Sequence, residues 1–156
     1  MQRITKSIAL ATVLSITATT AALGQAAAPE GMQAITAKSL TWVDADIPGF
    51  APGMKLAAIN GDPAAAGPYT LRLSFPDGYR FPAHWHPMTE NLTVLSGTLL
   101  LTMGERPDES KLTAYNAGDF LHIPATMPHS GGALGFTVIQ LHGQGPFTIN
   151  LVSPAK

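Results

Sequence analysis

Residues 78–97 carry the sequence GYRFPAHWHPMTENLTVLSG, and this stretch decides which fold the chain takes. His84 and His86 are separated by one residue, so on a β-strand both imidazoles point to the same face. Glu90 lies at an even offset from His86, and Leu92, which shares its parity, is expected to face the core. The stretch therefore predicts strands that carry two histidines and a carboxylate toward the interior.

The segments that flank this stretch have the pattern of short β-strands. Tyr69, Leu71, Leu73 and Phe75 alternate with more polar residues, which places the apolar set on one buried face. The 15 glycines and 13 prolines are too many for a helix bundle and supply the turns between strands. We expect an all-β sandwich or barrel without an amphipathic helix of useful length. Its expected strands cover residues 35–43, 56–59, 69–75, 91–95, 99–103, 112–115, 120–123, 135–142 and 147–152, with a turn at residues 96–98.

Length, charge and cysteine content exclude several classes of protein. With 156 residues the chain is long enough for one domain with a sizeable core. Only 12% of the residues are charged and 46% are hydrophobic, which argues against intrinsic disorder. The formal net charge of −1 argues against a nucleic-acid-binding protein, which needs a basic face. Because the sequence has no cysteine, it has no disulfide, thiolate metal site or cysteine nucleophile.

Residues 1–26 are predicted to be a secretory signal peptide. Arg3 and Lys6 supply a positively charged start, a mostly small and apolar run follows, and small residues offer cleavage sites after Gly24 or Ala26. The apolar run is short and diluted by hydroxyl residues, so a stable membrane-spanning helix is disfavoured. We therefore expect residues 27–156 to form a single exported domain, periplasmic or secreted, with no membrane span after cleavage.

His84, His86, Glu90 and the later His129 are candidate metal ligands. Imidazole nitrogens and carboxylate oxygens suit first-row divalent metals. Spacing alone leaves two other interpretations open. The histidines can be a half-exposed pair on a strand, and the glutamate can be a core residue with hydrogen-bond partners of its own.

Two motifs in the chain resemble the two motifs of the cupin superfamily. The first family motif is G, five residues, H-x-H, three or four residues, E, six residues, G, and every anchor is present here. These anchors are Gly78, His84, His86, Glu90 and Gly97. The second motif is represented by Gly118, Pro124 and His129, whereas Thr126 stands where the family usually has glycine and Ala133 where it often has asparagine.

The resemblance implies a double-stranded β-helix, the jelly roll of a cupin-type barrel, with a divalent transition metal at one open end. It implies that His84, His86, Glu90 and His129 hold this metal and that Glu90 can leave it to act as a catalytic base. Iron, zinc, copper and manganese are not distinguished by such a donor set. Because similar sites in the family support oxygen chemistry, we expect an oxidoreductase of the dioxygenase type that acts on a small organic substrate.

Two other functions are carried as alternatives. One is a non-catalytic cupin module that binds or senses a metal or a small ligand. The other is a carbohydrate isomerase or epimerase, which the complete ligand set disfavours because such relatives usually work without a metal.

The roles of Gln140 and His142 depend on which face of their strand is buried. If they face inward, they can orient a ligand or substrate. If Ile139 and Leu141 form the buried face, the polar pair faces solvent.

The resemblance also allows a homodimer, through exchange of residues 35–43.

Overall fold

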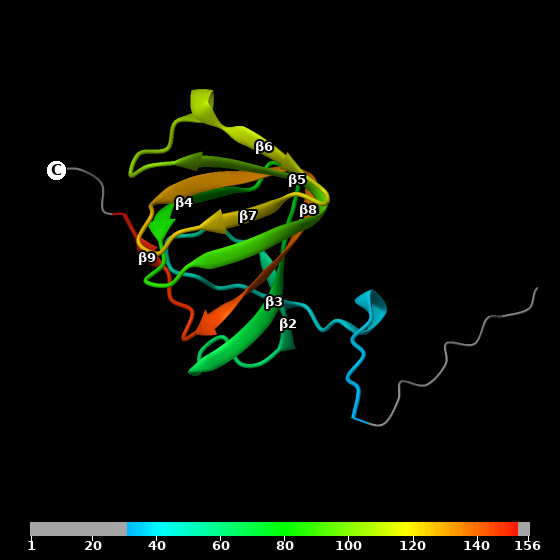
Figure 1. Cartoon of the computed structure of the whole chain (residues 1–156). Coiled ribbons are helices and arrows are strands. Elements are labelled where there is room, and N and C mark those ends of the chain that lie inside the picture. The colour runs from blue at the N-terminus through cyan, green and yellow to red at the C-terminus, as the bar shows by residue number, and fades with distance from the viewer. Residues whose placement is uncertain (1–30, 153–156) are drawn as a thin grey trace, which may run out of the picture. The chain divides into compact units, whose positions relative to one another are not determined.

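Two long strands, β5 (Glu90–Met103) and β8 (His129–Gly145), organise the fold. They are antiparallel and pair along most of their length, from Asn91 opposite His142 to Met103 opposite His129. The structure is a computed structural model that describes residues 31–152 (Figure 1). The other strands in this part of the chain are added on either side of the β5–β8 pair.

Each of the two long strands contributes one half to each of two sheets. In the first sheet, the C-terminal half of β8 pairs with β3 (Gly67–Phe75), and the N-terminal half of β5 pairs with β7 (Phe120–Ile123). Beyond β3, the sheet continues with β2 (Lys55–Asn60) and then β1 (Val43–Asp44). In the second sheet, the N-terminal half of β8 pairs with β4 (Arg80–Trp85), and the C-terminal half of β5 pairs with β6 (Thr113–Asn116). Beyond β4, the sheet continues with β9 (Asn150–Leu151). All these pairings are antiparallel. The expected all-β jelly roll is therefore confirmed.

Glycines allow the long strands to bend from one sheet into the other. Gly97 and Gly135 both have a φ of 73°, in the left-handed region that glycine adopts readily. A Cβ atom at Gly97 would collide with the carbonyl oxygen of Phe136, so no larger residue fits there. The predicted turn at residues 96–98 was wrong. β5 shifts its register there and continues, because β8 runs on beside it.

The hydrophobic core lies on the inner faces of the two sheets. Its innermost side chains include Leu71, Val94 and Leu141, each with 0% exposure. The predicted alternation in β3 is confirmed by the burial of Tyr69, Leu71 and Phe75, whereas Leu73 is only partly buried. Leu92 and Val94 face the core as predicted.

Two expected strands differ from the structure at the ends of the domain. Within residues 35–43 the chain forms a short 3-10 helix, η1 (Ala37–Ser39), and only Val43 belongs to a strand. This segment buries no side chain, so it has no apolar face that would fix it against a sheet. Within residues 147–152 only β9 is a strand. The homodimer formed by exchange of residues 35–43 stays a prediction.

The loop between β5 and β6 contains a second 3-10 helix, η2 (Glu109–Lys111). Among the described residues, no helix has the length and apolar character needed to cross a membrane. The predicted signal peptide, residues 1–26, lies outside the described residues, and its cleavage and the export of the domain stay predictions.

Candidate metal centre

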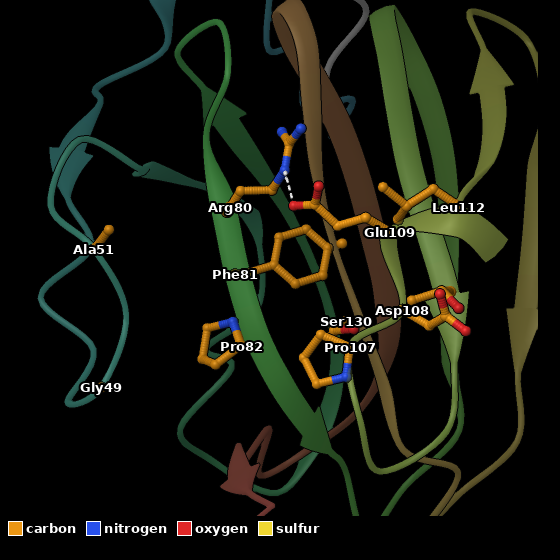
Figure 2. A pocket seen from close by; sticks show the side chains of 12 residues that line it. Gly49, Ala51, Arg80, Phe81, Pro82, Pro107, Asp108, Glu109, Leu112 and Ser130 are labelled. Atoms are coloured by element: carbon orange, nitrogen blue, oxygen red, sulfur yellow. Dashed lines mark ion pairs between the residues drawn. The ribbon is translucent and has the colours of Figure 1, made fainter.

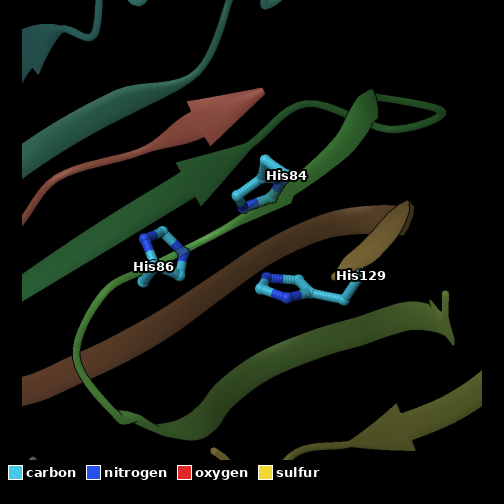
Figure 3. A group of neighbouring side chains, drawn as sticks. All are labelled: His84, His86 and His129. Atoms are coloured by element: carbon cyan, nitrogen blue, oxygen red, sulfur yellow. The ribbon is translucent and has the colours of Figure 1, made fainter. Parts of the chain in front are cut away.

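The structure brings three histidines together at one end of the two sheets. His84 lies in β4 and is the direct cross-strand partner of His129, the first residue of β8. His86 lies in the connection between β4 and β5. Their imidazoles point toward one another from these three places (Figure 3). One ligand nitrogen from each imidazole can be chosen so that all three lie within 4.8 Å of one another, and all three residues are buried.

Glu90, the first residue of β5, completes the group from the other sheet. Its Oε2 atom lies 3.3 Å from Nε2 of His129 and 3.6 Å from Nε2 of His86. The side chain is buried because its parity is that of Leu92 and Val94, which lie in the core. All four residues singled out by the sequence therefore meet at one point. Their role as metal ligands stays a prediction.

Backbone carbonyl groups fix the orientation of all three imidazoles. Nδ1–H of His84 donates to the carbonyl oxygen of Pro82 at 2.8 Å, and Nδ1–H of His86 donates to that of Thr148 at 2.8 Å. Nδ1–H of His129 donates to the carbonyl oxygen of Met127 at 3.1 Å. Since Nδ1 carries the proton in each neutral ring, Nε2 keeps its lone pair. Metal-binding histidines are held in this way in proteins generally.

Two of the converging atoms have no hydrogen-bond partner although they are buried. They are Nε2 of His86 and Oε2 of Glu90. A buried acceptor without a partner costs about 1–3 kcal/mol, and more when it is charged. A divalent cation between these atoms would satisfy both. The donor set of three imidazoles and one carboxylate therefore fits a transition metal better than it fits an unoccupied core.

The protonation states agree with a cation site. Burial lowers the pKa of His84 from 6.5 to about 4, and the nearby His129 adds to this effect. Burial also lowers the pKa of His86, against the opposing charge of Glu90. Burial alone would raise the pKa of Glu90, but His129 and the other histidines outweigh it and lower the pKa of this carboxyl. At neutral pH the ionised Glu90 carboxylate thus faces the neutral imidazoles of His84 and His86. These are the protonation states in which carboxylates and imidazoles bind metals.

Aromatic rings pack against the imidazoles of His84 and His86. Phe147 stacks on His86 with ring centroids 4.6 Å apart, while Phe50 and Phe81 contact the ring of His84 at 5.2 and 5.6 Å. A cavity of about 40 Å³ opens beside the site and is lined by three of the four candidate ligands, His84, Glu90 and His129. This cavity has room for a few water molecules or for the reacting group of a substrate.

Other polar residues considered from the sequence lie away from the centre. Ile139 and Leu141 are the buried face of β8, so the alternative in which Gln140 and His142 face outward is the one the structure shows. Gln140 accepts a hydrogen bond from Nε of Arg72 at 3.0 Å on that outer face. His142 is exposed.

Sequence reasoning missed the groups that support the ligands. Phe50 and Phe147 lie far from the histidine motif in the sequence, and so does Thr148, which contributes only its carbonyl oxygen. A backbone carbonyl leaves no signature in the sequence, and an isolated phenylalanine in a loop does not reveal what it will contact. The carbonyl groups of Pro82 and Met127 lie within the two motifs, each two residues before the histidine that it orients.

Comparisons with known proteins agree with this architecture. A family model described as a cupin domain matches residues 71–139. No curated protein matches the chain. The chain is similar in structure to the polyketide cyclase RemF from Streptomyces resistomycificus, with a TM-score of 0.66 and 16% identity over 80% of this chain and 88% of the other.

Two further solved structures have comparable similarity. One is a candidate acetylacetone dioxygenase from Methylibium petroleiphilum, with a TM-score of 0.62 and 16% identity over 83% of this chain and 87% of the other. The second is a cupin 2 conserved barrel domain protein from Rhodopseudomonas palustris, with a TM-score of 0.59 and 13% identity over 74% of this chain and 79% of the other. Identities this low show the fold alone.

Proposed function

The chain belongs to the cupin superfamily, and from this premise we propose that it is a metal-dependent enzyme of the oxygenase type. The metal is a divalent transition ion held by His84, His86, Glu90 and His129. The substrate is a small organic molecule. The domain works after export, in the periplasm or outside the cell, as the N-terminal sequence predicts.

The observation that carries this proposal is the set of unpartnered acceptors in the centre. Three imidazoles have their Nδ1 protons committed to backbone carbonyl groups, and an ionised carboxylate lies within 3.6 Å of two of their Nε2 atoms. No hydrogen bond within the centre satisfies Nε2 of His86 or Oε2 of Glu90. A bound cation supplies the missing positive charge.

The residues of the centre have distinct parts in such a reaction. A bound metal would polarise a substrate oxygen as a Lewis acid, and a redox-active one would add reactions with dioxygen. Glu90 can take a proton from the substrate because its carboxylate lies at the small cavity. Phe50, Phe81 and Phe147 exclude bulk water, which strengthens the electrostatic interactions in the centre.

The structural relatives support a small organic substrate. One is named as a polyketide cyclase and another as a candidate acetylacetone dioxygenase. The cavity beside His84, Glu90 and His129 is lined otherwise by apolar and aromatic side chains, which favour a weakly polar molecule over a sugar or a polyanion.

The size of this cavity favours a second candidate function. With about 40 Å³, the cavity holds only a fragment of most substrates. A protein that binds or senses a metal or a very small ligand needs no more space than this. The two functions differ in whether the bound metal keeps a position open to exchangeable water or substrate.

Metal analysis and oxygen uptake test the proposal together. The full chain is purified from the exported fraction without a metal-binding tag, and its metals are measured by mass spectrometry. We expect about one equivalent of a transition metal, which the variants His84→Ala and Glu90→Ala lose. His142→Ala, which removes an exposed histidine, is the matched control and keeps the metal.

The identity and reactivity of the metal then separate the two functions. Oxygen consumption with a β-diketone or a phenol, present in wild type and absent in both ligand variants, supports the enzyme. One equivalent of zinc without exchangeable water supports the binding function. A wild-type protein that holds no metal, and whose stability neither ligand variant alters, contradicts the site altogether.

A further inference from the structure

A second cavity lies beside the second sheet and shares one lining residue, Phe81, with the small cavity at the histidine centre. Ser130 follows His129 in β8, so its side chain leaves the strand on the other face. Thr102 of β5 is the cross-strand partner of Ser130, and both line this cavity of about 360 Å³. The loop that carries η2 also lines the cavity, through Pro107, Asp108, Glu109 and Leu112 (Figure 2).

The base of this cavity contains an unpartnered hydroxyl group. Ser130 is 2% exposed, and its Oγ atom has no hydrogen-bond partner. Buried hydroxyl groups in proteins are nearly always hydrogen-bonded, and leaving one without a partner costs about 1–3 kcal/mol. The described residues thus leave the Ser130 hydroxyl group without a partner, just beneath the surface of the cavity that Ser130 lines.

The walls of the cavity are apolar and the charges at its rim are paired. Phe81, Pro82, Pro107 and Leu112 form the apolar lining. At the rim, Nε of Arg80 lies 3.8 Å from a carboxylate oxygen of Glu109, an ion pair that Figure 2 shows. The neighbouring carboxylate of Asp108 is paired with Lys111 at 2.9 Å. With each rim charge opposed by another, the cavity does not select a charged ligand.

We propose that this cavity is a binding site for a neutral, mainly apolar small molecule with a single hydroxyl or carbonyl group that hydrogen-bonds to Ser130. Its volume of about 360 Å³ is at the lower end of the range of small-molecule sites, so it fits a molecule of one or two rings. Apolar walls with one or two polar groups are the usual composition of such sites. The site shares Phe81 with the surroundings of the metal centre but contains none of the four candidate metal ligands, so it does not require a metal.

A ligand pair tests the hydrogen bond directly. 2-Naphthol carries one hydroxyl group on a neutral two-ring system, and 2-methylnaphthalene replaces that group by a methyl of similar size. Their dissociation constants are measured by ligand-observed NMR on the full chain, for wild type and for Ser130→Ala. The ratio of the affinity for 2-naphthol to the affinity for 2-methylnaphthalene is expected to be about threefold to tenfold larger in wild type than in Ser130→Ala. This difference is the effect of one neutral hydrogen bond.

A second pair of variants locates the bound ligand. Leu112→Trp fills the cavity and is expected to weaken both ligands by about tenfold or more. Met88→Trp is the matched control, because Met88 lines a different cavity of about 600 Å³ around His142. It leaves both affinities unchanged. Treatment with a chelator also leaves them unchanged, so a failure here is independent of a failure of the metal site.

Three results would overturn the proposal. The first is an absence of saturable binding of both ligands to wild type. The second is an affinity ratio that Ser130→Ala does not change. The third is a loss of binding in Met88→Trp in place of Leu112→Trp. Circular dichroism establishes that each variant is folded, and the Ser130→Ala ratio remains decisive if Leu112→Trp does not fold.

Discussion

Replacement of Glu90 by glutamine should destabilise the protein, and more strongly with bound metal than without it. In the metal-free protein the ionised Glu90 faces Nε2 of His129 at 3.3 Å and of His86 at 3.6 Å, and its Oε2 atom has no hydrogen-bond partner. Glutamine has the same shape, removes the buried charge and offers an N–H group to one of these nitrogens. Because the histidines lower the pKa of the Glu90 carboxyl, the folded protein favours its ionised form over a neutral one, so we expect Glu90→Gln to destabilise the metal-free protein at pH 7.

The same substitution removes a metal ligand. Loss of groups that merely orient ligands weakens metal binding by about 10–100-fold, so loss of a ligand should weaken it by at least about 100-fold. At a metal concentration of about 100 times the wild-type dissociation constant, binding stabilises wild type by about 2.7 kcal/mol. The variant would be stabilised by only about 0.4 kcal/mol at the same concentration.

Urea denaturation at pH 7, with a chelator and then with the native metal, measures both effects. Glu109→Gln is the matched control, because the Glu109 carboxylate is exposed and its contact with Arg80 is 3.8 Å long. It should change the free energy of unfolding by less than about 1 kcal/mol in either condition. If Glu90→Gln stabilises the metal-free protein, the buried charge is a net cost there, and the reasoning from the lowered pKa of Glu90 is refuted.

Three further predictions concern pH, the core and the aromatic shell. Because the pKa of His84 is lowered from 6.5 to about 4, the unfolded chain binds a proton at pH values where the folded protein does not. The free energy of unfolding of the metal-free protein should therefore fall by about 3 kcal/mol between pH 6.5 and pH 4. Urea midpoints that do not change over this range would contradict this prediction. Leu99 is 1% exposed, and Leu99→Ala should destabilise the protein by about 2–5 kcal/mol. Leu134 is 61% exposed, and Leu134→Ala should destabilise it by less than about 0.5 kcal/mol. Thermal unfolding measures both effects, and equal losses of stability would show that Leu99 is not a core residue. Phe147→Ala removes the ring stacked on His86 and should speed metal release to a chelator by about tenfold; an unchanged rate would rule out a part for the ring in retaining the metal.

The sequence predicted the strands that have a strong local pattern. The expected strand at residues 120–123 coincides with β7, and the alternation from Tyr69 to Phe75 lies in β3. The prediction from sequence failed where a local turn signal competes with pairing to a distant strand. Ser96, Gly97 and Thr98 have the composition of a turn, but β5 bends there without reversing because β8 pairs with it on both sides of Gly97.

The histidine–carboxylate group shows the same division. Parity placed His84 and Glu90 on buried faces, and the resemblance to a family joined the candidate His129, from a remote segment, to the same ligand set. Neither could show that Gln140 and His142 face outward, since that depends on which side of β8 packs on the core.

By itself the sequence determined the strand periodicity, the all-β class and the residue types available to a metal, because these depend on neighbours within a few positions. The tertiary structure alone decided the bending of β5 and β8 between two sheets and the fixing of the His86 imidazole by the carbonyl group of Thr148. It also left the Ser130 hydroxyl group without a partner beside an apolar cavity. The pairing of β5 with β8 and the contact of His86 with Thr148 join residues that are distant in the chain, and such contacts follow from packing, which no local pattern encodes.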